Sequence, residues 1–327
     1  MLTPACSLYF THSRGAAAMR SQNDIRQDIT NSIIESLSNG SLPPWRKPWS
    51  DDPNSPGLHT SLSTGAVYRG INQLILQCSA AKQNFQSKWW GTFKQIQFNG
   101  ASVRKGQKAT KIVLWKPIKR SRIDENGKET DDSFMVMREF SVFNAEQTTG
   151  LDQFRVGHTK PNLDSEIRYQ HADEVIEATG ATINYGGNRA FYRRSDDTIT
   201  MPFRHQFESP ESFYETLLHE LVHWGVTRSD FERKQTKETY AFEELVAELG
   251  ASFLMGAFSI STTATTENSA SYLKQWLSAM ANDSTYIFKA SALSSKVVDQ
   301  HILSFSRDAE DAPEARNQPV LARSKSY

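Results

Sequence analysis

Residues 214–224 read YETLLHELVHW, and this stretch decides the fold of the second half of the chain. Its apolar residues recur at helical spacing, and a helix places His219 and His223 one turn apart on one face. Two neutral imidazoles at this spacing can bind one zinc ion while Glu220 accepts a proton from bound water, which is the arrangement of a zinc peptidase. The alternative is a buried helix with two hydrogen-bonded histidines. The chain has eight histidines in 327 residues, and chance gives this pattern in only about one per cent of such chains, so we favour the metal site.

A third protein ligand is expected from a second helix, because a catalytic zinc ion usually has three. Residues 241–249 read AFEELVAEL. On a helix, Glu244 and Glu248 share a face, whereas Glu243 points about 100° away. The apolar residues mark this helix as buried, where an unpaired carboxylate would be costly. The run from Glu244 to Glu248 resembles the Glu-x-x-(Ser/Ala)-(Asp/Glu) motif of gluzincin peptidases. That resemblance implies that Glu244 binds the metal and that Glu248 holds a ligand histidine in its tautomer. The expected cofactor is one Zn²⁺ per chain, with Mn²⁺ as an alternative.

The first half of the chain interleaves aromatic residues with cations. No Asp or Glu occurs between residues 84 and 122, a stretch with three tryptophans and many lysines and arginines. Aromatic side chains stack on unpaired bases while cations follow the phosphates, so this composition favours single-stranded DNA with little sequence preference. The alternatives are a charged hairpin surface and, for the proline-rich segment from Pro43 to Trp49, a tryptophan anchor over the core. The residues predicted to bind DNA are Trp45, Arg46, Lys47, Trp49, Lys88, Trp89, Trp90, Lys94, Arg104, Lys105, Lys108 and Trp115.

The pattern of predicted elements indicates an α+β fold with two domains. Residues 21–146 are expected to form an α+β single-stranded-DNA-binding domain, with helices near 24–39 and 70–84 and a β-hairpin from 111–115 and 134–143. Residues 147–162, with two glycines and a proline, are the expected linker. Residues 1–20 are expected to be an N-terminal extension, with Met19 as an alternative start.

The second domain, residues 163–305, is expected to be mostly helical and zincin-like. A helix at 165–179 precedes three short strands, of which the edge strand is expected to lie along the cleft. A long helix then begins at Ser209, with proline at its first position. Helices follow at 238–258, 270–281 and 284–305, and residues 306–327, which have few apolar side chains, are expected to be disordered.

The overall composition excludes few partners. Thirty-seven basic and 37 acidic residues cancel, so net charge argues for no partner. Two distant cysteines, Cys6 and Cys78, make no disulfide framework, which fits a reducing, cytoplasmic location. No apolar run is long enough to cross a bilayer, so we expect no membrane partner.

Taken together, these motifs resemble the ArdC-type antirestriction proteins, whose N-terminal domain also begins the TraC-type plasmid primases. The resemblance covers roughly residues 24–302 and rests on residues 45–49, 103–109 and 140–144 in the first half, and on residues 216–224 and 240–249 in the second. It implies a single-stranded-DNA-binding domain joined to a zincin-like metallopeptidase domain, encoded on conjugative plasmids and other mobile elements. The implied role is to protect incoming DNA from restriction. In one departure, the family usually continues Thr-Gly-His after Trp224, whereas residues 225–227 here are Gly, Val and Thr.

Three functions remain open from the sequence. The favoured one is a DNA-binding antirestriction protein with a working or latent peptidase, in which Glu220 passes a proton from water to a leaving amine. The oxyanion donor is Tyr240, Tyr185 or Arg189. A second is a DNA-coating protein with a purely structural metal. A third is a peptidase whose basic domain docks its protein substrate. The expected partners are single-stranded DNA and restriction–modification proteins or another protein substrate.

Overall fold

The computed structural model describes residues 20–39, 43–46, 52–55, 57–123, 129–158, 165–232, 234, 236–262 and 267–304. The expected N-terminal extension up to Met19 and the tail from residue 306 lie outside these ranges, as do Lys47, Trp49 and the hairpin turn at residues 124–128. Within the described ranges, none of the helices combines the length and the apolar character that crossing a membrane would require.

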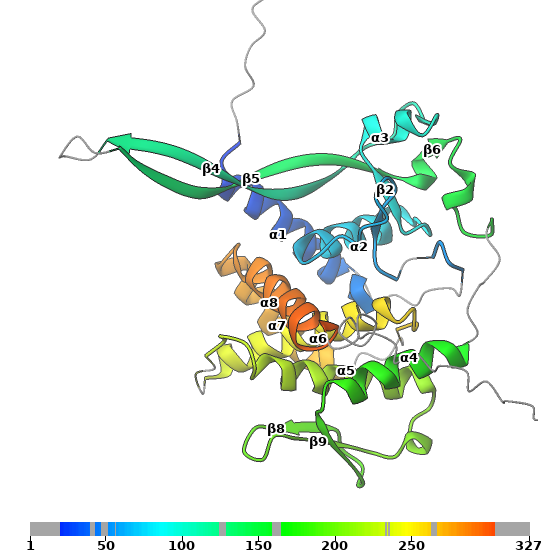
Figure 1. The fold of residues 1–327 in the computed structure, drawn as a ribbon, viewed down its shortest axis with the longest axis vertical. Helices are drawn as coiled ribbons and strands as arrows, with labels where there is room; N and C mark the ends of the chain where they lie inside the picture. Colours follow the sequence, from blue (N-terminus) through cyan, green and yellow to red (C-terminus); the bar gives the residue numbers. More distant parts are fainter. Residues whose placement is uncertain are drawn as a thin grey trace, which may run out of the picture.

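A long hairpin dominates the first half (Figure 1). Strands β4 (Thr110–Ile123) and β5 (Glu129–Asn144) pair antiparallel along their whole length, from Thr110↔Val142 to Ile123↔Glu129. They continue through β2 (Trp89–Gly91) to β1 (Thr60–Ser61) in the order β1-β2-β5-β4. The hairpin is longer than predicted because backbone pairing continues where the apolar alternation has stopped. Pro117 is tolerated in β4 because β4 is an edge strand, in which every second N–H points away from the partner strand and takes part in no ladder.

Two helices support this sheet. Helices α1 (Gln22–Asn39) and α2 (Ile71–Gln83) lie beneath the hairpin, close to the predicted positions (Figure 1). The short helix α3 (Phe93–Phe98) leads from β2 to β3 (Ser102–Val103). Strand β3 pairs with β6 (Thr148–Thr149), and Leu151 is fully buried against the same group of residues. Thr148–Thr149 and Leu151, which fall within the expected linker at 147–162, therefore pack with the first half. Such two-residue strands leave no periodic pattern in the sequence.

The second half has the predicted order of elements. Helix α4 (Ser165–Ala178) precedes a sheet of β7 (Thr182–Tyr185), β8 (Phe191–Arg193) and β9 (Thr198–Met201) in the order β7-β9-β8. Helices α5 (Pro210–Val226), α6 (Lys237–Ala257), α7 (Glu267–Asn282) and α8 (Tyr286–His301) follow. In Figure 1 the small sheet lies below α5, on the side away from the hairpin. The α+β architecture expected from the sequence is confirmed.

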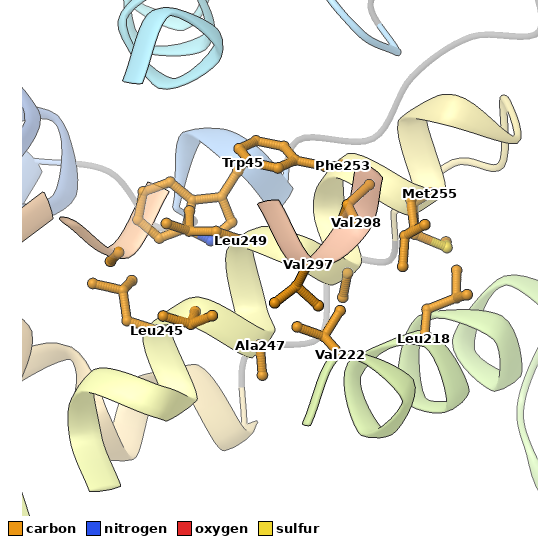
Figure 2. Close-up of a cluster of buried hydrophobic side chains, with 14 of the residues drawn as sticks. Trp45, Leu218, Val222, Leu245, Ala247, Leu249, Phe253, Met255, Val297 and Val298 are labelled. Atoms are coloured by element: carbon orange, nitrogen blue, oxygen red, sulfur yellow. The ribbon is translucent and has the colours of Figure 1, made fainter. Parts of the chain in front are cut away.

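Helices α5, α6 and α8 meet in the main core. Figure 2 shows Val222 of α5 between Ala247 of α6 and Val297 of α8, and Leu218 of α5 beside Met255 of α6. The close approach of α5 and α6 depends on Gly250, since a Cβ at that position would lie 2.7 Å from Val222 Cγ2. This contact sets the separation of the two helices that carry the candidate ligands.

Gly250→Ala is expected to destabilise the protein. Alanine favours a helix by about 1 kcal/mol over glycine, but overpacking costs about 1–3 kcal/mol, and the added methyl would overlap both methyls of Val222. Urea denaturation of the full chain measures the change. Val222→Ala in the same chain should recover part of the loss, and a double variant that recovers nothing would contradict the steric explanation.

One segment of the first half inserts into the second. The 3₁₀ turn Pro44–Arg46 brings Trp45, 0% exposed, onto α6 (Figure 2). Ser252 Oγ donates to the Trp45 carbonyl at 2.8 Å, and the next residue, Arg46, forms ion pairs with Glu215 and Glu248. The two halves therefore share a buried, charged contact directly beside the helices of the candidate site.

Candidate metal centre

Helix α5 places both histidines as predicted. Ser209 caps the helix by accepting a hydrogen bond from the Ser212 N–H at 3.2 Å, and Pro210 occupies the first turn. The apolar face of α5 is buried, so its register is fixed. The Nε2 atoms of His219 and His223 consequently lie 3.2 Å apart.

Glu244 of α6 completes the group. Its carboxylate oxygens lie 3.5 Å from His219 Nε2 and 3.6 Å from His223 Nε2. Metal–ligand bonds of about 2.0–2.2 Å put two ligand atoms of a tetrahedral zinc ion about 3.3–3.6 Å apart. The measured spacings of 3.2–3.6 Å therefore fit one divalent ion shared by these three side chains. This group is the cluster with metal-binding geometry found among the described residues.

Glu220 is held by the small sheet. Its Oε2 accepts a hydrogen bond from the Tyr192 backbone N–H at 2.8 Å. Tyr192 belongs to β8, an edge strand of the sheet, so the predicted position of an edge strand beside the site agrees with the structure. The sequence gives no sign of this contact, because any residue other than proline supplies a backbone N–H.

Glu243 is the residue that the sequence analysis missed. It is 1% exposed, and its Oε1 lies 3.1 Å from His223 Nδ1 and 2.8 Å from Arg194 Nη2. A hydrogen bond from Nδ1–H to this carboxylate leaves His223 Nε2 free to bind a metal. A buried carboxylate needs a partner, and this holds for Glu243 as much as for Glu244. That requirement was the feature of the sequence that could have identified Glu243.

Glu248 has different partners from those expected. Arg46 Nη2 lies 2.8 Å from its Oε2, the Arg46 Nε also contacts it, and Trp45 Nε1 donates to its Oε1 at 3.3 Å. Its charge still contributes to raising the pKa of His219, so the two are near neighbours. We expected Glu248 to accept a hydrogen bond from a ligand histidine. In the structure, Glu243 accepts such a hydrogen bond from His223.

Among the three candidates for an oxyanion donor, Tyr240 lies at the site. It is 38% exposed, lies one turn before Glu244 on α6, and its hydroxyl donates to the Glu244 carboxylate. Burial and the neighbouring Tyr272 and Glu244 raise the pKa of Tyr240, so the hydroxyl keeps its proton. Tyr185 instead stacks on Phe213, near the start of α5.

The structure contradicts several of the predicted DNA contacts. Trp45 and Trp90 are both 0% exposed, so neither can stack on a base. The Trp90 indole donates to His59 Nδ1 at 3.0 Å, and Arg46 is paired with two glutamates. Trp89 is half-buried, with its indole N–H on Asn54 Oδ1 at 2.7 Å. The sequence predicts that these tryptophans lie on the surface, because many of the residues next to them in the chain are polar.

The remaining predicted DNA contacts are accessible where the structure describes them. Trp115 is 37% exposed, with Arg26 stacked 5.5 Å from its ring centroid. Lys88 is half-buried. The exposed cations are Lys94, Arg104, Lys105 and Lys108.

Without metal, the stability of the protein is expected to depend on pH through His219 and Glu244. Burial lowers the pKa of His219, but Glu244 and nearby carboxylates raise it to about 9 from 6.5. Burial raises the pKa of Glu244, but His219 and His223 lower it to about 2 from 4.5. The stabilisation from His219 is complete below pH 6.5 and disappears as the pH rises through about 9. That from Glu244 is complete above pH 4.5 and disappears as the pH falls through about 2.

Thermal denaturation of metal-free protein should therefore show the largest contribution of this pair between pH 4.5 and 6.5. A divalent ion competes with the proton on His219, so added metal should stabilise the protein most at alkaline pH. His219→Gln is the control, since it should remove both the alkaline loss and the metal effect. An unchanged profile in that variant would contradict the assignment.

Comparisons with known proteins match both halves. Residues 23–143 match the family model for the N-terminal domain of the anti-restriction factor ArdC, and residues 170–293 match that for a zincin-like metallopeptidase. Two Escherichia coli proteins named DNA primase TraC are 32% and 34% identical over 308 and 294 residues, which are 88% and 84% of this chain. The chain spans only 20% and 26% of their lengths. The uncharacterized protein y4eC of Sinorhizobium fredii is 28% identical over 84% of this chain and 91% of its own.

Two crystal structures of the antirestriction protein ArdC from plasmid R388 share this fold. The metal-free structure is 33% identical, with a TM-score of 0.71 over 87% of this chain and 98% of the other. The Mn(II)-bound structure is 32% identical, with a TM-score of 0.69 over 88% and 99%. The chain covers nearly all of these relatives, with both halves in the same order, and it therefore belongs to the ArdC family of antirestriction proteins.

Proposed function

We propose that this protein protects DNA from restriction by binding its single strands without sequence preference, and that its second half is a zinc peptidase, either active or latent. The observation that carries the enzymatic part is the geometry of His219, His223 and Glu244, whose ligand atoms match the spacing of a tetrahedral ion. Glu220 beside them supports a catalytic metal over a purely structural one, because a structural site needs no such carboxylate.

The residues of the site have separable roles in this proposal. Bound zinc would supply the Lewis acid that makes a water molecule acidic near neutral pH. Glu220, oriented by the Tyr192 N–H, accepts the proton of that water and delivers it to the leaving amine. Glu243 keeps His223 in the tautomer that presents Nε2. The Tyr240 hydroxyl serves as the donor to the developing oxyanion.

The surface that we propose for DNA binding is not centred on the tryptophans that were predicted from the sequence. Helix α3 exposes Phe98 (91%) and Phe93 (49%), with Lys94 one turn before Phe98. The exposed cations Arg104 and Lys105 follow β3, which contacts α3. Exposed phenylalanines are costly in water, and aromatic faces flanked by cations suit stacked bases and their phosphates.

The proposal is tested on the full-length protein with labelled oligo(dT). If Lys94, Arg104, Lys105 and Lys108 each neutralise one phosphate, log K should fall with log salt at a slope of about −3, which is about fiftyfold between 50 and 200 mM. Phe98→Ala should weaken binding, whereas the buried-site variant Trp90→Phe should not. Absence of binding at low salt would rule out the DNA part.

Glu220→Gln separates the two activities. We expect this variant to keep its metal and its oligo(dT) affinity but to lose any peptidase activity. Protection of DNA entering by conjugation is then compared between this variant and the unchanged protein. Equal protection would mean that the peptidase is not what protects the DNA, and loss of metal would mean that Glu220 is structural.

A further inference from the structure

A cavity of about 590 Å³ lies between the two halves of the chain, apart from the metal centre. The first half contributes residues between Asp52 and Gln73 together with Lys88, and the second contributes residues of α4, α6 and α8. None of the described lining residues belongs to the metal centre. The volume is within the range of small-ligand sites, about 300–1,000 Å³.

The lining of the cavity combines apolar residues with polar and charged ones. Its apolar part includes Leu58 and Val67 from the first half and Phe253 and Val298 from the second. Tyr68 adds an aromatic ring to this lining, and burial raises the pKa of its hydroxyl. This apolar, partly aromatic part of the lining suits a planar ring.

Three cations line the same cavity, and two of them have partners. Arg69 is paired with Asp299, and Arg168 Nη1 donates to the Ser259 carbonyl at 2.9 Å. The third, Lys88, is half-buried, and its ammonium makes no hydrogen bond or ion pair with any residue in the described part of the chain.

Lys88 therefore lines the cavity without a hydrogen-bonded anion among the described residues, although the carboxylate of Asp52 also lines it. Its ammonium lies 5.3 Å from the Trp89 ring centroid. Burial lowers the pKa of Lys88, against a smaller opposing effect of Asp52. A half-buried ammonium without a hydrogen-bonded anion is costly, and a bound anion would remove that cost.

We propose that this cavity holds one nucleotide of a single-stranded DNA, with its phosphate on Lys88 and its base against the apolar lining. The inference rests on the DNA binding proposed above and adds a specific place for one nucleotide. A nucleotide is favoured over other anions because β2 connects Lys88 to the exposed aromatics of α3. Lys88 and Phe93 are separated by at most about 18 Å of extended polypeptide chain, so a single strand of DNA can contact both residues.

The test uses the full-length protein with 5′-dTMP, thymidine and a short oligo(dT). We expect dTMP to bind and to compete with the oligonucleotide, and thymidine to bind more weakly because it lacks the phosphate. Lys88→Gln should weaken dTMP binding about 10- to 100-fold, the effect of losing one charge-assisted hydrogen bond. Val67→Trp, which fills the cavity from a 39% exposed position without changing a charge, should abolish it. The control is Lys289→Gln on α8, a lysine that is not among the residues lining the cavity.

The outcomes separate this proposal from the proposed function. If oligo(dT) binds with the expected salt dependence but dTMP does not bind, or binds equally to Lys88→Gln and Val67→Trp, the cavity is not a nucleotide site and general DNA binding stands. If the unchanged protein fails to bind oligo(dT) at low salt, the proposed function fails, and the cavity proposal falls with it.

Discussion

Replacing Glu244 by alanine is expected to remove the metal from the protein almost completely. The remaining Nε2 atoms of His219 and His223 would supply only two ligands, whereas zinc sites of this kind use three protein ligands and a water. Loss of an outer residue that merely supports a ligand costs about 10–100-fold in affinity, so loss of a ligand should cost more than about 100-fold. Elemental analysis after dialysis and competition with a chelating dye measure the two quantities, with one ion per chain expected in the unchanged protein.

Glu243→Gln provides the matched comparison, since Glu243 and Glu244 are adjacent on α6 and both are buried. Glu243 contacts His223 Nδ1 and Arg194, on the far side of the imidazole from Glu244. The variant should therefore lose only about 10–100-fold in affinity, as expected for a supporting residue. Full metal retention in Glu244→Ala, together with complete loss in Glu243→Gln, would mean that the third ligand has been misassigned.

The sequence predicts the centre of this site well because local geometry determines it. The i, i+4 spacing of His219 and His223 on a capped helix is enough to place both Nε2 atoms together. The same reasoning puts Glu244 and Glu248 on one face of α6, but it does not predict which residues of other elements pack against each face. Glu243 contacts His223 because of how α5 and α6 cross. That crossing depends on the contact of Gly250 with Val222.

The roles of the tryptophans could not be predicted for a related reason. Trp45 and Trp90 stand among polar and basic residues in the sequence, which is typical of a surface, and only tertiary contacts bury them. Trp45 packs on α6, some 200 residues away along the chain, and its anchor role was one of two alternatives that the sequence left open. Exposed Phe98 was a weaker signal in the sequence than either tryptophan, although it is 91% accessible.

Arg46→Met is expected to destabilise the protein by about 3–5 kcal/mol, the cost of breaking a buried ion pair from one side. Arg46 contacts Glu215 on α5 and Glu248 on α6, whose side chains are only 11% and 4% exposed. Burial would lower the pKa of Arg46, but these two carboxylates raise it, so the guanidinium remains charged. Without it, two buried carboxylates lie near each other and near the candidate ligands. Urea denaturation of the full chain gives the change in the free energy of unfolding.

Two comparisons make this result specific. Lys82→Met breaks a pair with Glu35 whose side chains are 67% and 55% exposed, and it should cost less than about 1 kcal/mol. Adding Glu248→Gln to Arg46→Met should recover part of the lost stability, because it removes one of the two uncompensated charges.

The same variant decides whether Arg46 binds DNA, as predicted from the sequence, or joins the two halves, as its ion pairs indicate. A residue that binds DNA would lose oligo(dT) affinity and reduce the salt slope by about 0.7 when replaced, with little change in stability. A residue that joins the two halves would do the opposite, leaving oligo(dT) affinity intact while the free energy of unfolding falls. We expect the second result, since the guanidinium of Arg46 already has two carboxylate partners and its side chain is only 12% exposed. If the variant is stable but binds DNA more weakly, Arg46 is a DNA-binding residue after all.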